Sequence, residues 1–537
     1  MAANKKHDCD VAIIGAGHNG LTCAAYLAGA GLSVRVFERR GLVGGAAVTE
    51  EFAPGFRNST ASYTVSLLHP QVIADLDLYA NGLTVVERAI ANFWPLGDKP
   101  GAYLKLSFDG ARNAEEFARH SPDDAAALPR YSADIESAAD VLREIALETP
   151  PNLGGGAGDA WRAIRTANRF RRSPTSRQVL IFDLFTKSAA EFLKSYFSHP
   201  AIVAALAFDG VVGNYAATDA PGTAYVLLHH AFGEVNGARG QWGHAVGGMG
   251  AITGAMARAA EARGAVIATD AAVAETLIEN GRAVGVRLAD GRTVRARAVV
   301  SNANPKLLAR DLLPDDAAPA FRARMDGYAC GSGSLRMNVA LDAPPAFSCA
   351  PDDDGEHLRA GIIIGPSLDY MDRAYFDART RGWSEAPIVE MLIPSFVDDT
   401  LAPAGKHVAS LFCQHFAPPP PNGRSWDDDR EAAADAAIAA VERFAPGFAE
   451  RIVARQIHTP LDLERKFGLV GGDIFHGRLS LDQMFSARPT PGAADYRLPV
   501  PGLYLCGSGA HPGGGVTGLP GRNAAREIAR DFGRRIG

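Results

Sequence analysis

The stretch Val11-Ala-Ile-Ile-Gly15-Ala-Gly17-His-Asn-Gly20 decides the fold, because an apolar strand runs directly into a glycine-rich turn. Apolar residues recur at helical spacing from Leu21 onward, so strand, turn and helix follow the order of a dinucleotide-binding unit. In such a unit the glycines allow a sharp turn, close approach of the backbone to a pyrophosphate, and tight packing of the helix. The helix amides then face the phosphates. The residues expected at this turn are Gly15, Ala16, Gly17, His18, Asn19 and Gly20.

A second strand is predicted over residues 33–37, and Glu38 closes it. An acidic residue about 20 positions beyond the first glycine of such a turn hydrogen-bonds the adenosine ribose. Glu38 argues against a 2′-phosphate, whereas Arg39 and Arg40 beside it leave NADP open as an alternative. The competing interpretation of the whole unit is an ordinary crossover whose glycines serve packing alone.

Length and composition predict a globular protein of more than one domain. The chain has 537 residues, of which 47% are hydrophobic and 21% charged, and single cores stop growing well below this length. Its 54 basic and 60 acidic residues give a net charge of −6, which predicts no nucleic-acid surface. The six cysteines lack CxxC or CxxxxC spacing, so we expect reduced thiols, no disulfide chemistry and no metal site.

Residues 1–10 contain no apolar run typical of a secretory signal, and no stretch approaches the roughly 18 apolar residues of a membrane span. We therefore expect a cytoplasmic protein that is soluble or peripherally associated with a membrane. An amphipathic helix in the middle of the chain could provide such contact. The basic cluster at residues 169–172 is interpreted either as a solvated face or as a contact for phosphate or anionic lipid.

Two further glycine-rich segments resemble those of a known family. Gly44-Gly45 follows Glu38 closely, and a strand near the C-terminus leads into Gly507-Ser-Gly-Ala-His-Pro-Gly-Gly-Gly515-Val516. Too few residues remain after it for another βαβ unit, which needs about 30, so it must complete a site begun elsewhere. Together with Val299-Val-Ser-Asn-Ala-Asn-Pro305, these motifs resemble the flavoprotein oxidoreductases of the phytoene desaturase type.

The resemblance implies an α/β fold, α+β overall, in which a Rossmann-like FAD-binding domain of the glutathione-reductase/amine-oxidase type carries an inserted substrate domain of antiparallel sheet and helices. We place the FAD-binding domain at 1–75, 239–306 and 499–537, and the substrate-binding and helical cap domain at 76–238 and 307–498. The resemblance implies that the C-terminal segment passes the flavin and that Val273 passes the adenine. It adds as cofactor-binding residues Arg39, Gly44, Gly45, Ala46, Val273, Gly507, Ser508, Gly515 and Val516.

Ala46 departs from the family pattern, which has an arginine after the glycine pair in amine oxidases and many desaturases. A charge partner for the pyrophosphate is therefore missing at this position. The departure weakens an assignment as an amine oxidase.

The two insertions are predicted to differ in structure. The first contains Ala-rich helical segments at 121–149 and 187–210, with a glycine-rich patch and a basic patch between them. The second contains strand-like pieces at 334–341, 362–365, 388–393 and 407–414 and a helical stretch at 427–444. Alternating Val389, Met391 and Ile393 predict a half-buried sheet covered by helices of the first insertion. Asp290-Gly291 predicts a hairpin turn.

The resemblance implies an FAD-dependent oxidoreductase that dehydrogenates or saturates a C–C bond of a small apolar substrate of the isoprenoid or lipid class. His511 is the candidate catalytic residue, and capping of a glycine-rich turn is its competing interpretation. Two other functions stay open. One is a flavin-dependent isomerase or hydratase of an alkene without net redox chemistry, and the other is an FAD-stabilised interaction protein without catalysis.

Overall fold

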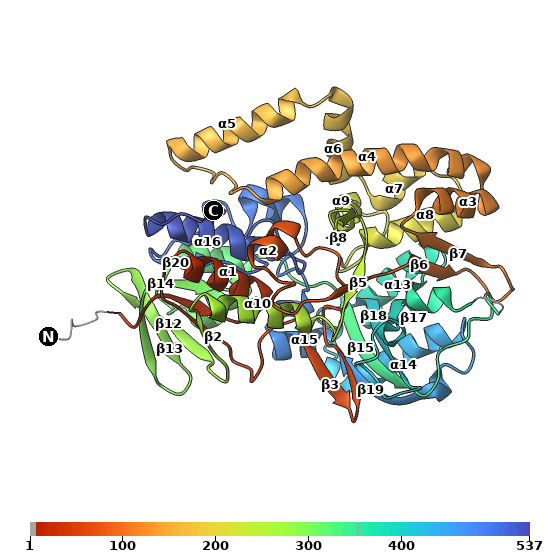
Figure 1. Ribbon diagram of the computed structural model, residues 1–537. Coiled ribbons are helices and arrows are strands. Elements are labelled where there is room, and N and C mark those ends of the chain that lie inside the picture. The colour runs from red at the N-terminus through yellow and green to blue at the C-terminus, as the bar shows by residue number, and fades with distance from the viewer. Residues whose placement is uncertain (1–6, 352–353, 537) are drawn as a thin grey trace.

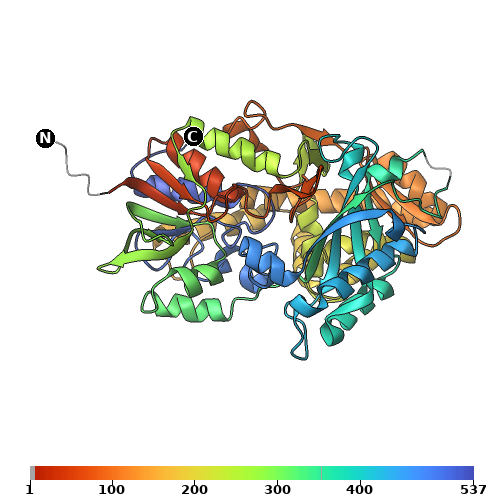
Figure 2. The ribbon, with the colours of Figure 1, turned by 90° about the horizontal axis from the view of Figure 1, so that it is seen from below.

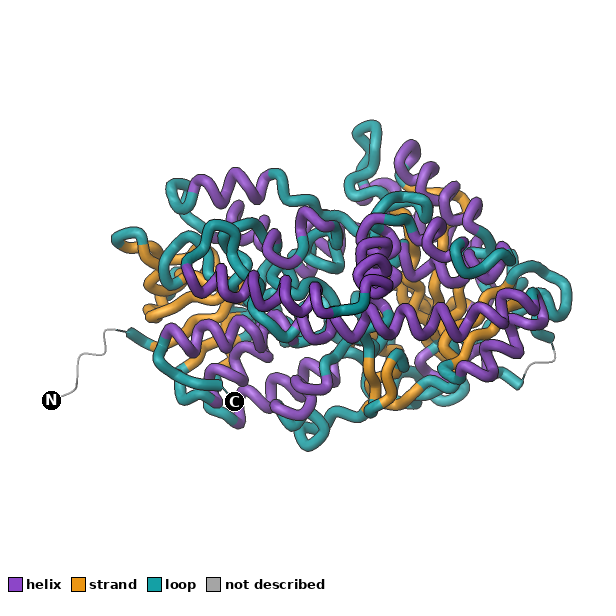
Figure 3. Tube along the Cα trace, turned by 90° about the horizontal axis from the view of Figure 1, so that it is seen from above, coloured by secondary structure: helices purple, strands orange, loops and turns teal. Residues whose placement is uncertain are grey.

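A computed structural model describes residues 7–351 and 354–536. Residues 1–6, on which part of the N-terminal prediction falls, lie outside the described residues, as do 352–353 and the last residue of the predicted 499–537 segment. Figure 1 shows two sheets side by side, with helices of the first insertion lying above them. Seen from above in Figure 3, helices cover most of the strands.

The first sheet is built from segments far apart in the chain. Its parallel strands follow the order β11-β2-β1-β14, and β20 pairs with the other side of β14. Ile14 lies opposite both Phe37 and Ser301, so these strands end at one edge. The strands are β1 (Cys9–Ile14), β2 (Val34–Phe37), β11 (Val266–Ala268), β12 (Val273–Glu279), β13 (Arg282–Leu288), β14 (Thr293–Ser301) and β20 (Leu503–Leu505).

The predicted hairpin is confirmed, because β13 and β14 pair antiparallel around Asp290-Gly291, where Gly291 has a φ of 88°. Helices α1 (His18–Gly29), α10 (Gly250–Ala262) and α16 (Leu519–Asp531) pack against one another beside this sheet.

The second sheet has seven strands in the order β19-β15-β18-β17-β16-β6-β7, antiparallel except for the β16–β6 pair. The four strands predicted in the second insertion are confirmed as β15 to β18. Two of its other strands, β6 and β7, come from the first insertion, where we predicted helices and no strands. β6 ends at Pro95, and β7 pairs with it antiparallel. The strands are β6 (Ile90–Pro95), β7 (Tyr103–Ser107), β15 (Ser334–Leu341), β16 (Gly361–Ile364), β17 (Trp383–Leu392), β18 (His407–Phe416) and β19 (Ile452–His458).

Helices cover both faces of this sheet, so the prediction of a half-buried sheet is wrong. Val389, Met391 and Ile393 share a core with α14 (Trp426–Glu442), which lies along one face in Figure 2. On the other face Ile388 and Phe412 share a core with helices of the first insertion, as expected. Polar residues of this second face are buried too, which the alternation alone could not indicate.

The helical insertion is more divided than predicted. The segment 187–210 splits before Pro200, because proline cannot continue a preceding helix. The predicted basic patch is itself a helix, α5. The helices here are α3 (Gly110–His120), α4 (Pro122–Ala146), α5 (Ala157–Arg172), α6 (Thr175–Thr186), α7 (Ala189–Lys194), α8 (Pro200–Ala207) and α9 (Thr223–His230), and those elsewhere are α2 (Pro70–Asp75), α11 (Pro305–Leu307), α12 (Pro319–Asp326), α13 (Leu368–Arg381) and α15 (Pro460–Phe467).

Short strand pairs connect the two halves, namely β3 (Thr49–Ala53) with β4 (Phe56–Ser59), β5 (Val85–Glu87) with β10 (Gly243–Ala245), and β8 (Glu234–Val235) with β9 (Ala238–Arg239). Within the described residues, none of the helices combines the length and the apolar composition needed to cross a bilayer.

Candidate cofactor and substrate site

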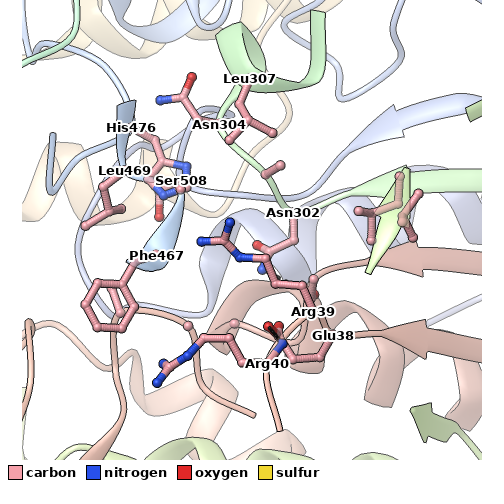
Figure 4. Close-up of a pocket in the computed structure, with 18 of the residues that line it drawn as sticks. Glu38, Arg39, Arg40, Asn302, Asn304, Leu307, Phe467, Leu469, His476 and Ser508 are labelled. Carbon is pink, nitrogen blue, oxygen red and sulfur yellow. Dashed lines mark hydrogen bonds between the residues drawn. The ribbon is translucent and has the colours of Figure 1, made fainter. Parts of the chain in front are cut away.

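A cavity of about 310 Å³ opens at the edge where the parallel strands end (Figure 4). The register of β2, β1 and β14 puts Glu38, Gly15 and Asn302 side by side there, one residue beyond each strand. Ligands of open α/β sheets bind at this edge. The predicted residues that line the cavity are Gly15, Gly17, His18, Glu38, Arg39, Gly45, Ala46, Val273 and Ser508.

The glycine turn forms a cradle that side chains would fill. Gly15 has a φ of 92°, and a Cβ at Gly20 would lie 2.2 Å from the carbonyl oxygen of Gly15. A Cβ at Gly17 would lie 2.8 Å from Nδ2 of Asn302. The first turn of α1 therefore sits directly against the end of β1, with its N-terminus at the cavity. This arrangement fits a pyrophosphate, because helix N-terminal amides attract negative charge.

Glu38 is held in place by the backbone on both sides. The amide of Ala16 donates to Oε2 at 2.9 Å and the amide of Arg40 donates to Oε1 at 3.0 Å. Each carboxylate oxygen can accept more than one hydrogen bond, and the side chain lines the cavity although only 5% of it is exposed. The residue therefore fits the predicted ribose contact.

Other predicted residues do not line the cavity but contact the residues that do. Nδ2 of Asn19 donates to Oγ of Ser508 at 3.1 Å, which ties the turn to the C-terminal segment. Gly44 donates its amide to the carbonyl oxygen of Ala16 at 2.8 Å. A Cβ at Gly507 would lie 2.5 Å from the carbonyl oxygen of Asn302. Ala16, Asn19, Gly20, Gly44 and Gly507 thus shape the site from outside its lining.

Gly515 and Val516 line a separate cavity of about 110 Å³. A ring nitrogen of His18 lies 3.1 Å from the carbonyl oxygen of Gly515, so this cavity adjoins the glycine turn. Its walls are mainly apolar, with Val65, Leu67, Leu68, Val212, Met249, Ile252, Phe412, Ile474 and Phe475, and the titratable side chains that reach it are Tyr63, His229 and His230.

Buried charges stand behind the small cavity. The hydroxyl of Tyr63 donates to Glu390, and the guanidinium of Arg336 lies 4.5 Å from the Tyr63 ring centroid. Burial raises the pKa of Glu390 and lowers the pKa of Arg336 to about 10. These groups fix the position of Tyr63 in the cavity wall.

His511 lies in neither of these two cavities. It lines a third cavity of about 390 Å³, between α4, α5, α6 and the C-terminal segment. Its Nε2 lies 3.1 Å from the carbonyl oxygen of Ile145, and burial lowers its pKa to about 4. The structure therefore separates His511 from the other predicted site residues, and its catalytic role stays a prediction.

Sequence reasoning missed several residues of the site. Asn302 and Asn304 line the first cavity, and the strand-ending motif that contains them was the signal that could have assigned them. Phe467 and His476 also line it but come from loops and a short helix without a motif. Arg488 is fully buried and donates to the carbonyl oxygens of Ser508 and Phe475, both at 2.7 Å, so it holds the C-terminal segment in place.

Comparisons with known proteins agree with this architecture. The model of a family described as flavin containing amine oxidoreductase matches residues 20–529. Pyridine nucleotide-disulfide oxidoreductase domain-containing protein 2 of Rattus norvegicus is 40% identical, over 98% of this chain and 94% of its own. All-trans-zeta-carotene desaturase of Myxococcus xanthus is 26% identical, over 97% of this chain and 92% of its own.

Among solved structures, an oxidoreductase from Methanosarcina mazei superposes with a TM-score of 0.61 at 18% identity, over 97% of this chain and all of the other. The similarity confirms the predicted fold, a Rossmann-like FAD-binding domain with a substrate domain. The family match confirms the oxidoreductase class and FAD as cofactor. It also shows that Ala46 does not exclude the chain from the family named after amine oxidation. The domain boundaries and the individual site residues stay predictions.

Proposed function

The chain belongs to the family of flavin-containing amine oxidoreductases, and on that premise we propose that it dehydrogenates or saturates a C–C bond of an apolar substrate. The observation that carries the proposal is the small cavity at Gly515 and Val516, whose walls are mainly aliphatic and aromatic. The apolar part of a substrate around its reacting carbons would bury its surface against these walls. The relation to a protein named as a carotene desaturase supports the same substrate class.

The residues of the first cavity would hold FAD along its length. The Gly15 to Gly20 turn would bind the pyrophosphate, Glu38 the ribose and Val273 the adenine, while the segment 507–516 would flank the flavin. When bound, the flavin supplies hydride acceptance or donation, and the protein orients the substrate and tunes the reaction. The apolar walls would exclude water from the reacting carbons.

Removal of hydride from one carbon leaves a proton on the neighbouring carbon that needs an acceptor. His229 lies in the cavity beside Gly515, and its Nδ1 has no hydrogen-bond partner among the described residues. Burial lowers its pKa to about 3, so the ring is unprotonated at neutral pH but is a weaker base than an exposed histidine. We assign proton acceptance to His229 in preference to His511, because His511 faces a different cavity.

Anaerobic mixing tests the proposal. Protein with oxidised FAD is mixed with ζ-carotene in detergent micelles and with total lipid extracts, while flavin absorbance is followed. Bleaching that requires the substrate is expected for dehydrogenation, and His229→Gln should slow it while FAD is retained and His511→Gln leaves the rate unchanged. An isomerised or hydrated product without bleaching of the flavin would refute the redox assignment. Slower bleaching only in His511→Gln would show that the proton acceptor is His511, in the third cavity, and not His229.

A further inference from the structure

Helix α5 is held on the molecule in an unusual way, because none of its residues is fully buried. It lies in the uppermost layer of helices in Figure 1, together with α6. The inward-facing residues Ala163, Thr166, Ala167 and Phe170 line the cavity of about 390 Å³. These positions are spaced three, four and seven apart, so they form one face of the helix. α5 therefore covers one side of an apolar cavity.

Two large apolar side chains of α5 lie outside this face and are exposed among polar and basic residues. Trp161 and Ile164, one turn apart, are 60% and 59% exposed. On the neighbouring helix α6, Val179 and Phe182 are 53% and 66% exposed, and Leu153 before α5 is 63% exposed. Half of the exposed large hydrophobic side chains of the described residues lie in this one segment of the chain. Surfaces of this kind mark interaction sites.

The charged side chains of this surface indicate which kind of partner binds to it. Arg165 and Arg169 pair with Glu148 at 3.0 and 3.1 Å. Arg171 and Arg172, at the end of α5, are exposed and have no ionic partner among the described residues. A helix that presents tryptophan and aliphatic residues beside free arginines has the composition of a helix bound at the surface of an anionic bilayer.

We propose that α5 and α6 dock on a bilayer that contains anionic lipids, and that an apolar chain from this bilayer enters the cavity beneath α5. The cavity is lined by Leu142, Ile145, Phe170, Phe185 and Phe485 on its apolar sides. The Phe185 ring stacks on Tyr225 of α9 at 4.8 Å, and His229 of the same helix lines the small cavity next to Gly515. Phe185 of the entry cavity thus contacts the helix that also lines the cavity at the predicted flavin, and a substrate taken up beneath α5 would pass α9 to reach that cavity. This route rests on the proposed function, because it supplies an apolar substrate.

The position of Trp161 gives a direct readout. The protein has five tryptophans, and the other four are buried or partly buried. Vesicles of phosphatidylcholine and phosphatidylglycerol, in which the phosphatidylcholine is brominated along its acyl chains, should quench the fluorescence of the full-length FAD-bound protein. Trp161→Phe should remove this quenching while flotation with the vesicles is retained, since phenylalanine is still apolar.

Flotation of variants separates the two components of the surface. Arg171→Glu with Arg172→Glu should weaken binding to the mixed vesicles by about 30-fold or more, because each cation near such a surface contributes roughly fivefold. Trp161→Ser with Ile164→Ser should weaken it as well. The matched control is Arg373→Glu with Phe376→Ser on α13, where both side chains are exposed, and it should float like the unmodified protein. Circular dichroism and FAD content verify folding.

Equal flotation of all variants, or no quenching of Trp161 by brominated lipid, would overturn the proposal, as would binding of this face to a protein and not to vesicles. The outcome is distinguishable from failure of the proposed function. If vesicles are not bound but ζ-carotene in micelles still bleaches the flavin, docking is refuted and the function stands. If vesicles are bound and no apolar compound bleaches the flavin, the proposed function is refuted and docking on the bilayer stands.

Discussion

At the scale of single residues, Gly20 offers the sharpest test of the turn. A Cβ there would lie 2.2 Å from the backbone oxygen of Gly15, so Gly20→Ala must displace the turn or α1. We expect a loss of about 1–3 kcal/mol in unfolding free energy, as for other overpacked positions, and loss of bound FAD. Urea unfolding and the ratio of flavin to protein absorbance measure both.

Gly158→Ala is the matched control for this change. It lies in α5, and a Cβ there would meet nothing within 4 Å. Alanine at a compatible helical position stabilises by about 0.4–1 kcal/mol, so this variant should keep its FAD and its stability. Full FAD occupancy in Gly20→Ala would show that the turn does not hold the cofactor.

Single residues also show what the sequence could and could not predict. Gly15, Gly17 and Glu38 were predictable because their roles follow from a local order of strand, turn and helix. Arg488 was not, since its five donors bond carbonyl oxygens of separate loops that no local pattern brings together. His511 lines a different cavity from the other predicted residues, because a chain segment has two sides and only packing decides which cavity each side faces.

At the scale of elements, Asp398 joins the two halves of the molecule. It lies in the loop between β17 and β18, and its Oδ2 accepts from the His244 ring at 2.8 Å and from the amide of Gly247 at 2.7 Å, in the segment before α10. Burial alone would raise its pKa. The hydrogen bonds from His244, Thr400 and Gly247 outweigh burial and lower the pKa to about 2.

This lowered pKa predicts a pH dependence of stability. A carboxyl whose pKa is depressed by folding contributes stability above its unfolded pKa, near 3.9, and that contribution is lost as the pH falls toward 2. Unfolding free energy should therefore fall between about pH 5 and pH 2, and less steeply in Asp398→Asn. The exposed Asp316→Asn is the control and should follow the unmodified protein. Identical slopes in all three proteins would contradict the role of Asp398.

Elements were predicted best where one pattern extended over the whole element. The strands β15 to β18 and the helix α4 were predictable from long periodic segments. The strands β6 and β7 were missed because they are stabilised by pairing across the two insertions: β6 pairs with β16 of the second insertion, and β7 pairs with β6. Likewise, the sequence could not show that the basic patch, which is α5, covers a cavity, because this depends on which face of the helix packs inward.

At the scale of the whole molecule, one cofactor would connect three distant parts of the chain. The cavity takes lining residues from the glycine turn, from the segment after β14 and from Ser508 near the C-terminus. A ligand that contacts all three stabilises only the state in which they are together. Removal of FAD should therefore lower the melting temperature, and added FAD should raise it. The unfolding free energy should grow with the logarithm of the free FAD concentration, by about 2.7 kcal/mol at a concentration of a hundred times Kd.

Hydrogen exchange distinguishes this linkage from local binding. With FAD bound, the amides of residues 15–20, 302–304 and 507–510 should gain protection together, because closing one segment on the ligand positions the others. The amides of α5 should not change, since no residue of α5 lines that cavity. In Gly20→Ala the melting temperature should no longer depend on FAD concentration. Protection confined to residues 15–20 would show that the segments bind independently, and the assignment of Ser508 to the cofactor site would then fail.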